Sequence, residues 1–284
     1  VAFEGLHLNG SVAKFEGVVE DDLGNLVCSF TPIWKGKGYL MLTPEAGRSY
    51  VATVNGPDGK QHKIPLPEAK NEGFRLSVET MELGDEIVLS VVKSSPVQSE
   101  EAVFLLALQN GVPMAGFKDS LVNGATNFNV PLADLKTGIV QFTLFDANKV
   151  PRCERLVFVN KNDALQLTIK EAELPNGPRG KVVLDLFAAN SQGVPVVGDF
   201  AVSVTDADRI PDEAYRSADI YQYLSLLSNI PNNFPQPSLL FSTTRRSRIL
   251  ADLLMLTNGW RRYDWTKVMA EKIDIPQYLE EPGI

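Results

Sequence analysis

Short apolar runs, separated by polar turn residues, fill the chain from its first residue to about residue 208. The runs are four to eight residues long, and they are either rich in β-branched side chains or alternate between apolar and polar positions. Alternation with a period of two is typical of a strand that buries one face. The pattern therefore predicts short strands throughout this part of the protein.

One kind of turn recurs between these strands. An apolar strand runs into a turn of Asp, Asn and Gly residues, and a second strand follows, at residues 21–25, 109–111, 146–149 and 190–193. Asn, Asp and Gly supply the positive φ angles that tight hairpins require. A proline follows three of the turns, at Pro113, Pro151 and Pro195. Because proline has no N–H to donate to a ladder, it marks a strand start or an edge.

A longer repeat lies over this pattern. Residues 38–43 resemble residues 138–143, which follow 100 positions later, and each segment leads through a turn into a second strand. A sandwich of about seven strands needs about 100 residues. The spacing therefore predicts a mostly β protein built from tandem Ig/fibronectin-like antiparallel β-sandwiches.

Two polar stretches without periodicity, residues 94–101 and 160–163, mark the expected unit boundaries. We expect a first sandwich over residues 1–95, a compact second sandwich unit over 96–161, and a third β unit over 162–284 with a helical C-terminal segment appended. The chain begins inside an apolar run, so the first sandwich is expected to be truncated at its N-terminus.

Beyond Asp206 the spacing of apolar residues becomes helical. Ser217 is a predicted helix cap, and the apolar residues after it share one helical face, at Ile220, Tyr223, Leu224 and Leu227. Thr244 is expected to cap a second helix over residues 245–258, with Gly259 at the position that follows a helix end. Asp264 is expected to cap a last short helix.

The acidic composition of the chain argues against two classes of binding partner. The 284 residues carry a net charge of −8 and a pI of about 5.0, which argues against a nucleic-acid partner and against docking on anionic lipid. No apolar run reaches the length of a membrane-spanning helix, about 18 residues. Cys28 and Cys153 are too few for a disulfide scaffold and are expected to be small buried side chains.

The sequence contains no motif typical of a catalytic or metal site. His7 and His62 are far apart in sequence and lie beside predicted strands, so no catalytic residue, metal ligand or cofactor is predicted. Paired carboxylates occur at residues 21–22 and 100–101 in a turn and a linker, and Asp206 and Asp208 follow a strand. The last pair leaves open a calcium site or carboxylate-based hydrolysis. A turn-stabilising role, or pairing with Arg209, is favoured.

An unusual cluster of aromatic and basic residues lies near the C-terminus. It is a candidate interaction surface formed by Trp260, Arg261, Arg262, Tyr263 and Trp265. Trp and Arg together can bind a ligand by stacking and cation–π contact. The same residues can instead hold a helix end on a sandwich, with Trp buried and Arg lying over it. The second interpretation is favoured.

The aromatic and basic cluster is also part of a segment that resembles a known family. Residues 202–207, 217–220, 224–228 and 253–265 resemble a segment of large exported proteins of Bacteroidetes-type bacteria, which carry macroglobulin-like (MG-type) β-sandwich domains and are associated with TonB-dependent outer-membrane receptors. Residues of the first two units are similar as well, at 36–39, 43–44, 50–52, 137–146 and 154–159. The segment over 253–265 is the most specific part of the resemblance.

The resemblance implies a non-enzymatic scaffold or protein-interaction region of a larger cell-envelope protein, in the periplasm or at the outer-membrane surface. The partners that the resemblance implies are other domains of the same polypeptide or envelope proteins, beside a TonB-dependent uptake system. Neither Cys28 nor Cys153 lies in the Cys-Gly-Glu-Gln thioester motif of protease-trapping macroglobulins, so covalent trapping is not implied. The alternative is a glycan- or peptide-binding module that uses exposed Trp34, Trp260 and Trp265 with nearby arginines.

Overall fold

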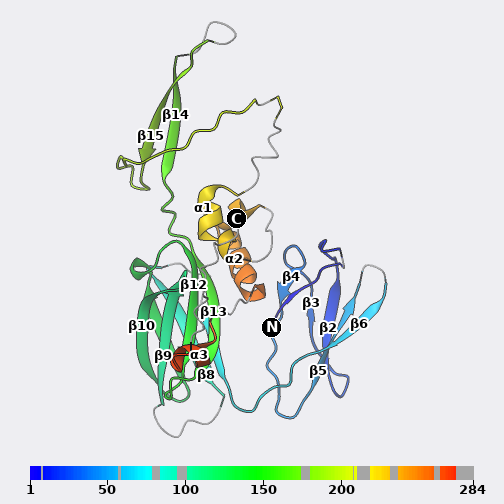
Figure 1. The fold of residues 1–284 in the computed structure, drawn as a ribbon. Coiled ribbons are helices and arrows are strands. Elements are labelled where there is room, and N and C mark those ends of the chain that lie inside the picture. Colours follow the sequence, from blue (N-terminus) through cyan, green and yellow to red (C-terminus); the bar gives the residue numbers. More distant parts are fainter. Residues whose placement is uncertain are drawn as a thin grey trace.

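The protein is mostly β, with antiparallel sheets followed by a short helical segment (Figure 1). The computed structural model describes residues 1–7, 9–56, 59–78, 84–94, 101–173, 180–206, 208–209, 218–230, 236–258 and 263–272. Every strand pair recorded among them is antiparallel. The predicted fold class is therefore confirmed.

The first unit packs a small sheet against a larger one. The small sheet pairs β1 (Ala2–Glu4) with β4 (Lys37–Tyr39). The larger sheet has the order β3 (Leu26–Phe30), β2 (Glu16–Asp21), β5 (Tyr50–Asn55) and β6 (Gln61–Pro65). Residues of the larger sheet and Leu40, which follows β4, meet in one buried cluster, formed by Val19, Phe30, Leu40, Tyr50 and Ala52.

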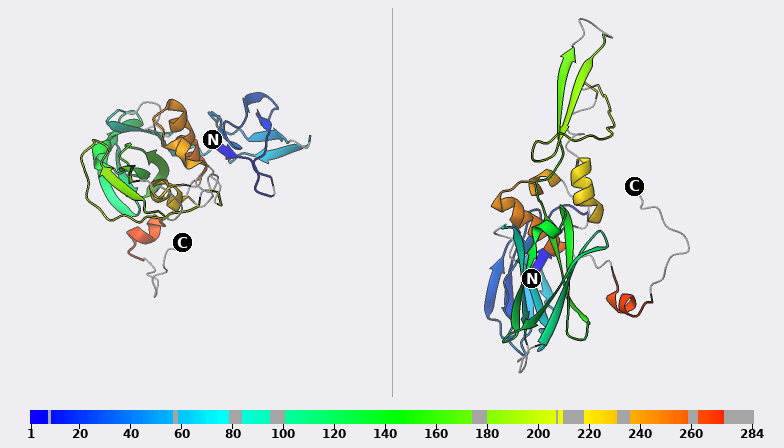
Figure 2. Two further views of the ribbon diagram at one scale, coloured as in Figure 1. Left: turned by 90° about the horizontal axis from the view of Figure 1, so that it is seen from above. Right: turned by 90° about the vertical axis from the view of Figure 1, so that its left-hand side faces the viewer.

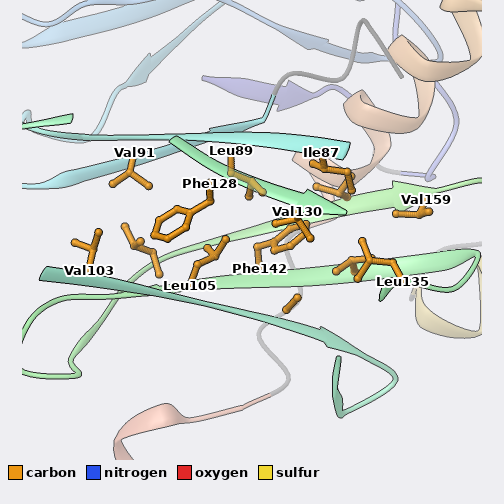
Figure 3. Packing of buried hydrophobic residues seen from close by; sticks show 14 of the residues in the cluster. Ile87, Leu89, Val91, Val103, Leu105, Phe128, Val130, Leu135, Phe142 and Val159 are labelled. Carbon is orange, nitrogen blue, oxygen red and sulfur yellow. The ribbon is translucent and has the colours of Figure 1, made fainter. Parts of the chain in front are cut away.

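The second unit is a seven-stranded sandwich. One sheet has the order β11 (Ala125–Pro131), β8 (Glu86–Lys93) and β7 (Phe74–Val78). The other has the order β10 (Val112–Leu121), β9 (Glu101–Gln109), β12 (Gly138–Phe145) and β13 (Pro151–Val159), and a 3-10 turn, Leu132–Asp134, follows β11. Figure 3 shows apolar side chains of both sheets interdigitating in a single core. Two antiparallel sheets around one core are the arrangement expected of an Ig/fibronectin-like sandwich.

The sequence-based boundary at residue 95 cuts through this core. Strands β7 and β8 fall within the predicted first unit, yet Leu89 and Val91 of β8 pack with Leu105 and Phe142 of the other sheet. The polar stretch at 94–101 connects β8 to β9 inside one sandwich rather than joining two sandwiches. A surface loop and an interdomain linker are both solvated, so their compositions look alike.

The third unit contributes one described hairpin. It pairs β14 (Gln166–Glu173) with β15 (Val183–Ala189), and Pro195 bridges back to Ala189 after the next turn. Figures 1 and 2 show the hairpin projecting beyond the end of the second sandwich. Residues 200–205 lie in the part of the chain for which the sequence predicts short strands, but they belong to no sheet of the described structure.

The recurrent turn has the same hydrogen bonds in all three units. Its first residue, Asp21, Asp146 or Asn190, accepts the backbone N–H of the residues two and four positions later through its Oδ1 atom. The fourth turn residue has positive φ, at Gly24, Lys149 and Gly193. The β9–β10 hairpin instead turns on Asn110 and Gly111, with φ of 50° and 82°. The turn prediction is confirmed, because Asp and Asn satisfy the turn's amides locally.

We expect Asp146→Ala to lower the free energy of unfolding of the second sandwich by about 1–3 kcal/mol, the range for hydrogen bonds to a charged group. The buried carboxylate accepts N–H groups of Asn148 and Val150 at 2.9 Å and Arg152 Nε at 2.7 Å. Asp146→Asn is the control and should lower the free energy of unfolding by less. An asparagine Oδ1 can accept the same two backbone N–H groups, as Asn190 does in the equivalent turn of the third unit. Urea denaturation measures both, and equal losses would contradict this account.

The same carboxylate makes stability depend on acid pH. Burial acts to raise the pKa of Asp146, but hydrogen bonds from Val150, Arg152 and Asn148 outweigh it, and the pKa lies below its ordinary value. A lowered folded-state pKa gives stabilisation that is present above the unfolded pKa, about 3.9, and is lost as pH falls through the folded value. Urea midpoints measured from about pH 5 to pH 2 should therefore fall less in Asp146→Asn than in the parent protein.

The three α-helices begin at side-chain caps. They are α1 (Ile220–Ser225), α2 (Arg245–Thr257) and α3 (Trp265–Met269), and the 3-10 helices η3 (Leu227–Asn229) and η4 (Pro237–Leu240) lie between α1 and α2. Thr244 caps α2 and Asp264 caps α3, as predicted. Asp219 rather than Ser217 caps α1, by accepting the Gln222 N–H. Ser217 and Gly259 lie outside the described residues.

Candidate functional site

The helices follow the third unit in sequence but pack on the second sandwich. A buried cluster of the helical segment, residues 220–257, contains Leu226, Ile230, Leu240, Leu250, Ala251, Leu254 and Met255. It lies against Ile139, Leu156 and Phe158, which are on the outer face of β12 and β13. These three alternate with core residues such as Val140 and Val157, so both faces of the two strands are apolar.

The same cluster reaches the first unit through Trp34. This half-buried indole packs against the helical cluster, and α2 contacts β1 and β4 as well as β13. Figure 2 shows α2 lying between the two β units. Trp34 is therefore part of an interface between units, which is not the exposed platform that a glycan-binding interpretation requires.

Polar contacts fix the position of α2 on the edge strand β13. Arg155 of β13 forms an ion pair with Asp252 of α2, and both side chains are largely buried. Burial raises the pKa of Asp252, although the neighbouring Arg155 acts in the opposite direction. Nearby, Asn160 Nδ2 donates to the Phe241 carbonyl at 2.9 Å, and the Phe158 and Phe241 rings meet edge to face at 5.1 Å. A helix that covers an edge strand also shields it from pairing with other chains.

The C-terminal aromatic residues pack on another part of the same outer face. Trp265 Nε1 donates to Glu154 Oε1 at 2.8 Å, and the Trp265 ring lies 5.2 Å from the Phe145 ring in an edge-to-face contact. The Tyr263 ring lies 5.7 Å from the Trp265 ring in a tilted contact, and its hydroxyl lies against Gly111, where a Cβ would clash with it. Both side chains are half-buried.

The structure therefore places two of the five predicted surface residues in a packed contact. Trp260, Arg261 and Arg262 lie outside the described residues. Beside Tyr263 and Trp265 runs a shallow polar groove of about 380 Å³, lined by Pro151, Arg152, Cys153, Glu154, Tyr263, Asp264, Trp265 and Thr266. A cavity under α2 measures only about 60 Å³, which is too small for a typical organic ligand.

We expect Trp265→Phe to speed tryptic cleavage after Lys267 about fivefold, because losing one hydrogen bond costs about 1 kcal/mol. The Phe ring keeps the contact with Phe145, so Trp265→Ala, which loses both interactions, should be cleaved faster still. Trp34→Phe is the matched control and should leave this cleavage rate unchanged. Equal cleavage in all four proteins would show that Trp265 does not hold α3 on the sandwich.

The histidines and paired carboxylates considered as chemical candidates lie at exposed positions, in turns or in ion pairs. His7 and His62 are exposed in the first unit. Asp206 accepts the Asp208 N–H at 3.0 Å and lies 3.4 Å from Arg209, in an exposed turn. Other carboxylates are paired with basic side chains: Asp21 and Asp22 with Arg48, and Glu101 with Lys93. Glu100 lies outside the described residues.

Across the described ranges, no group of three or more His, Cys, Asp or Glu side chains is arranged to hold a metal ion. No helix of the described structure has both the length and the apolar character needed to cross a membrane. Cys28 and Cys153 are free thiols that pack against different cores. Burial raises the pKa of the Cys153 thiol, which donates to the Phe74 carbonyl at 3.0 Å.

The docking face for the helices is the feature that sequence reasoning missed. A signal for it exists in residues 156–159, where four apolar side chains occupy successive positions instead of alternating. A continuous apolar run is typical of a strand that is buried on both faces. The run therefore indicated a second layer outside β13, although it did not say which segment forms that layer.

Comparisons with known proteins identify no family. No protein-family model matches the chain, and no curated protein matches it. One solved structure, described as a tetra-tandem repeat in the extending region of a large adhesion protein, is similar with a TM-score of 0.31 and 15% identity. The match covers 64% of this chain and 57% of that chain. At this distance the likeness adds nothing to the strand topology described above.

Proposed function

We propose that this chain is a non-enzymatic scaffold region of a larger extracytoplasmic protein. The observation that carries the proposal is the cluster under α2, where Trp34 of the first unit and Leu156 and Phe158 of the second pack on one helix. A helix that contacts two β units at once restricts their relative motion. The two units then act as one spacer of fixed shape.

The surroundings of the polar groups favour a scaffold over an enzyme. The carboxyl group of Asp21 has a pKa of about 2, because Asn25 of the same turn and the more distant Arg48 donate hydrogen bonds to it. Asp146 and Asp252 are engaged in a turn and an ion pair. Catalytic acids and bases instead need perturbed groups that converge on a pocket.

The location and partners belong to the same proposal. The resemblance to MG-type regions of exported Bacteroidetes-type proteins supports a place in the periplasm or at the outer-membrane surface. It also supports partners among envelope proteins, with a TonB-dependent uptake system as the neighbouring machinery. Fractionation of cells that produce the full-length protein tests the location: recovery in the cytoplasmic fraction would contradict it.

A distance measurement tests the spacer directly. Spin labels at Lys63→Cys on β6 and Asn127→Cys on β11 sit at exposed positions in the first and second units. With Cys28 and Cys153 replaced by serine, double electron–electron resonance should give one narrow distance distribution. A broad distribution in the parent background would show that the units move independently and would end the spacer proposal.

The polar groove beside Tyr263 and Trp265 favours a second candidate, a glycan- or peptide-binding module. Aromatic rings next to Arg152 could receive a sugar or an extended peptide. Calorimetric titration with oligosaccharides and peptides tests this candidate, with Trp265→Ala as the variant that should abolish any binding. Unchanged affinity in that variant would exclude the groove as the binding site.

A further inference from the structure

The β14–β15 hairpin has one mostly apolar face and one mostly polar face. Its register places Ile169 opposite Leu186, with Leu167 and Leu184 on the same side and Glu171 at the edge of this face. On the other side Lys170 lies opposite Asp185, and its ammonium group lies over the ring of Phe187. The four apolar side chains are between 40% and 64% exposed, whereas their counterparts inside the second sandwich are buried. The hairpin is therefore half of a sandwich whose inner face is uncovered in the described structure.

The segment that follows has the pattern of the strand that is missing. Within residues 200–205, Phe200, Val202 and Val204 alternate with small or hydroxylated residues. Val202 and Val204 are 76% and 88% exposed, and the segment is extended outside any sheet of the described structure. Figure 1 shows this part of the chain leaving the hairpin as a bare trace. The apolar side of residues 200–205 and the apolar face of the hairpin are both exposed, and each could bury the other.

We propose that residues 200–205, the strap, fold over the apolar face of β14–β15 and close the third unit as a sandwich. The strap's alternate apolar side chains then cover Leu167, Ile169, Leu184 and Leu186. This inference does not depend on the proposed scaffold function, since it concerns only how the third unit buries its apolar surface.

The first unit provides the precedent within this chain. There, the recurrent turn leads into β3, and the chain then crosses to β4 in the small facing sheet, where Leu40 is buried. In the third unit the same turn leads into residues 194–196, and the strap follows. Facing sheets pack about 10 Å apart, which is about the reach of the three residue steps from Val197 to Phe200.

The small size of the face favours a strap from the same chain over a second molecule. The eight residues of β14 and their partner strand present about 250 Å², at about 3.3 Å per residue and about 5 Å per strand. Stable protein interfaces bury about 800 Å² on each partner. A tethered strap acts at an effective concentration in the millimolar range, about 100-fold above a protein at 10 μM.

Crosslinking tests the strap. In a background with Cys28→Ser and Cys153→Ser, the double variant Val202→Cys with Ile169→Cys is treated with a short bismaleimide. The matched control replaces Val202→Cys by Ser203→Cys, because Ser203 lies on the opposite face of the strap. A strap on the apolar face should give crosslinked monomer at least about tenfold faster for Val202→Cys than for Ser203→Cys, because successive side chains of a strand point to opposite faces and only residue 202 then faces residue 169.

Any other crosslinking result would contradict the proposal that the strap packs on the hairpin. Equal rates for the two pairs, or no crosslinking of either, would show that the segment does not pack on this face. Crosslinked dimer instead of monomer would show that a second copy covers the face by exchanging straps, which would overturn closure within one chain. Circular dichroism of each variant before crosslinking verifies that its strand content matches that of the parent.

Discussion

Replacing Phe142 with alanine is expected to lower the free energy of unfolding of the second sandwich by about 3–5 kcal/mol. The Phe142 side chain is 0% exposed, and it lies in the core between the two sheets (Figure 3). Its removal loses the transfer free energy of the ring and leaves a cavity that the surrounding strands fill only in part. Domains are stable by only about 5–15 kcal/mol, so a loss of this size is a large fraction of the total.

Thermal and urea unfolding, followed by circular dichroism, measure the Phe142→Ala effect. A fall in Tm of more than about 10 °C is expected for a unit of this size. Val112→Ala is the matched control in the same sheet, because Val112 is exposed and should change stability by less than about 0.5 kcal/mol. Similar losses in both variants would show that the core is not packed as described.

Replacing Leu254 with alanine is expected to detach α2 from the two β units. Leu254 is 1% exposed within the cluster that also contains Trp34 and Phe158, and leucine truncation at such a site costs about 2–5 kcal/mol. Because every 1.4 kcal/mol is a factor of ten, amide exchange across α2 should accelerate at least about 30-fold. The core of the second sandwich should keep its protection, since it is built from other residues.

Leu256→Ala is the control for that experiment. Leu256 belongs to the same helix but is 37% exposed, so its truncation should leave exchange nearly unchanged. Spin labels at Lys63→Cys and Asn127→Cys connect the two results: the Leu254→Ala background should broaden their distance distribution, and the Leu256→Ala background should not. If detachment of α2 leaves the distribution narrow, the units are held together by other contacts.

Local sequence signals predicted the parts of the fold that depend on neighbouring residues. Alternation of apolar positions located the strands, because one face of each strand is buried. Asp21, Asp146 and Asn190 marked their turns, because each side chain binds amides of its own turn. Thr244 and Asp264 marked helix starts for the same local reason.

What the sequence did not predict are distant contacts. The boundary at residue 95 separated β8 from the sheet with which it shares a core. The favoured interpretation of the aromatic and basic cluster was packing on a sandwich, but the sequence did not identify Glu154, 111 positions away, as the partner of Trp265. Strap residues 200–205 have a strand's pattern, yet pattern alone does not provide a neighbouring strand to pair with.

The sequence by itself determined a mostly β protein with recurrent hairpin turns and a helical C-terminal segment. Each of these follows from side-chain periodicity or from hydrogen bonds within a few residues. Only the tertiary structure decided that seven strands on both sides of residue 95 form one sandwich. It alone decided that α2 packs between the first two units. Burial of an apolar face is favourable, but the amino-acid sequence does not state which partner covers it, because many apolar faces are chemically equivalent.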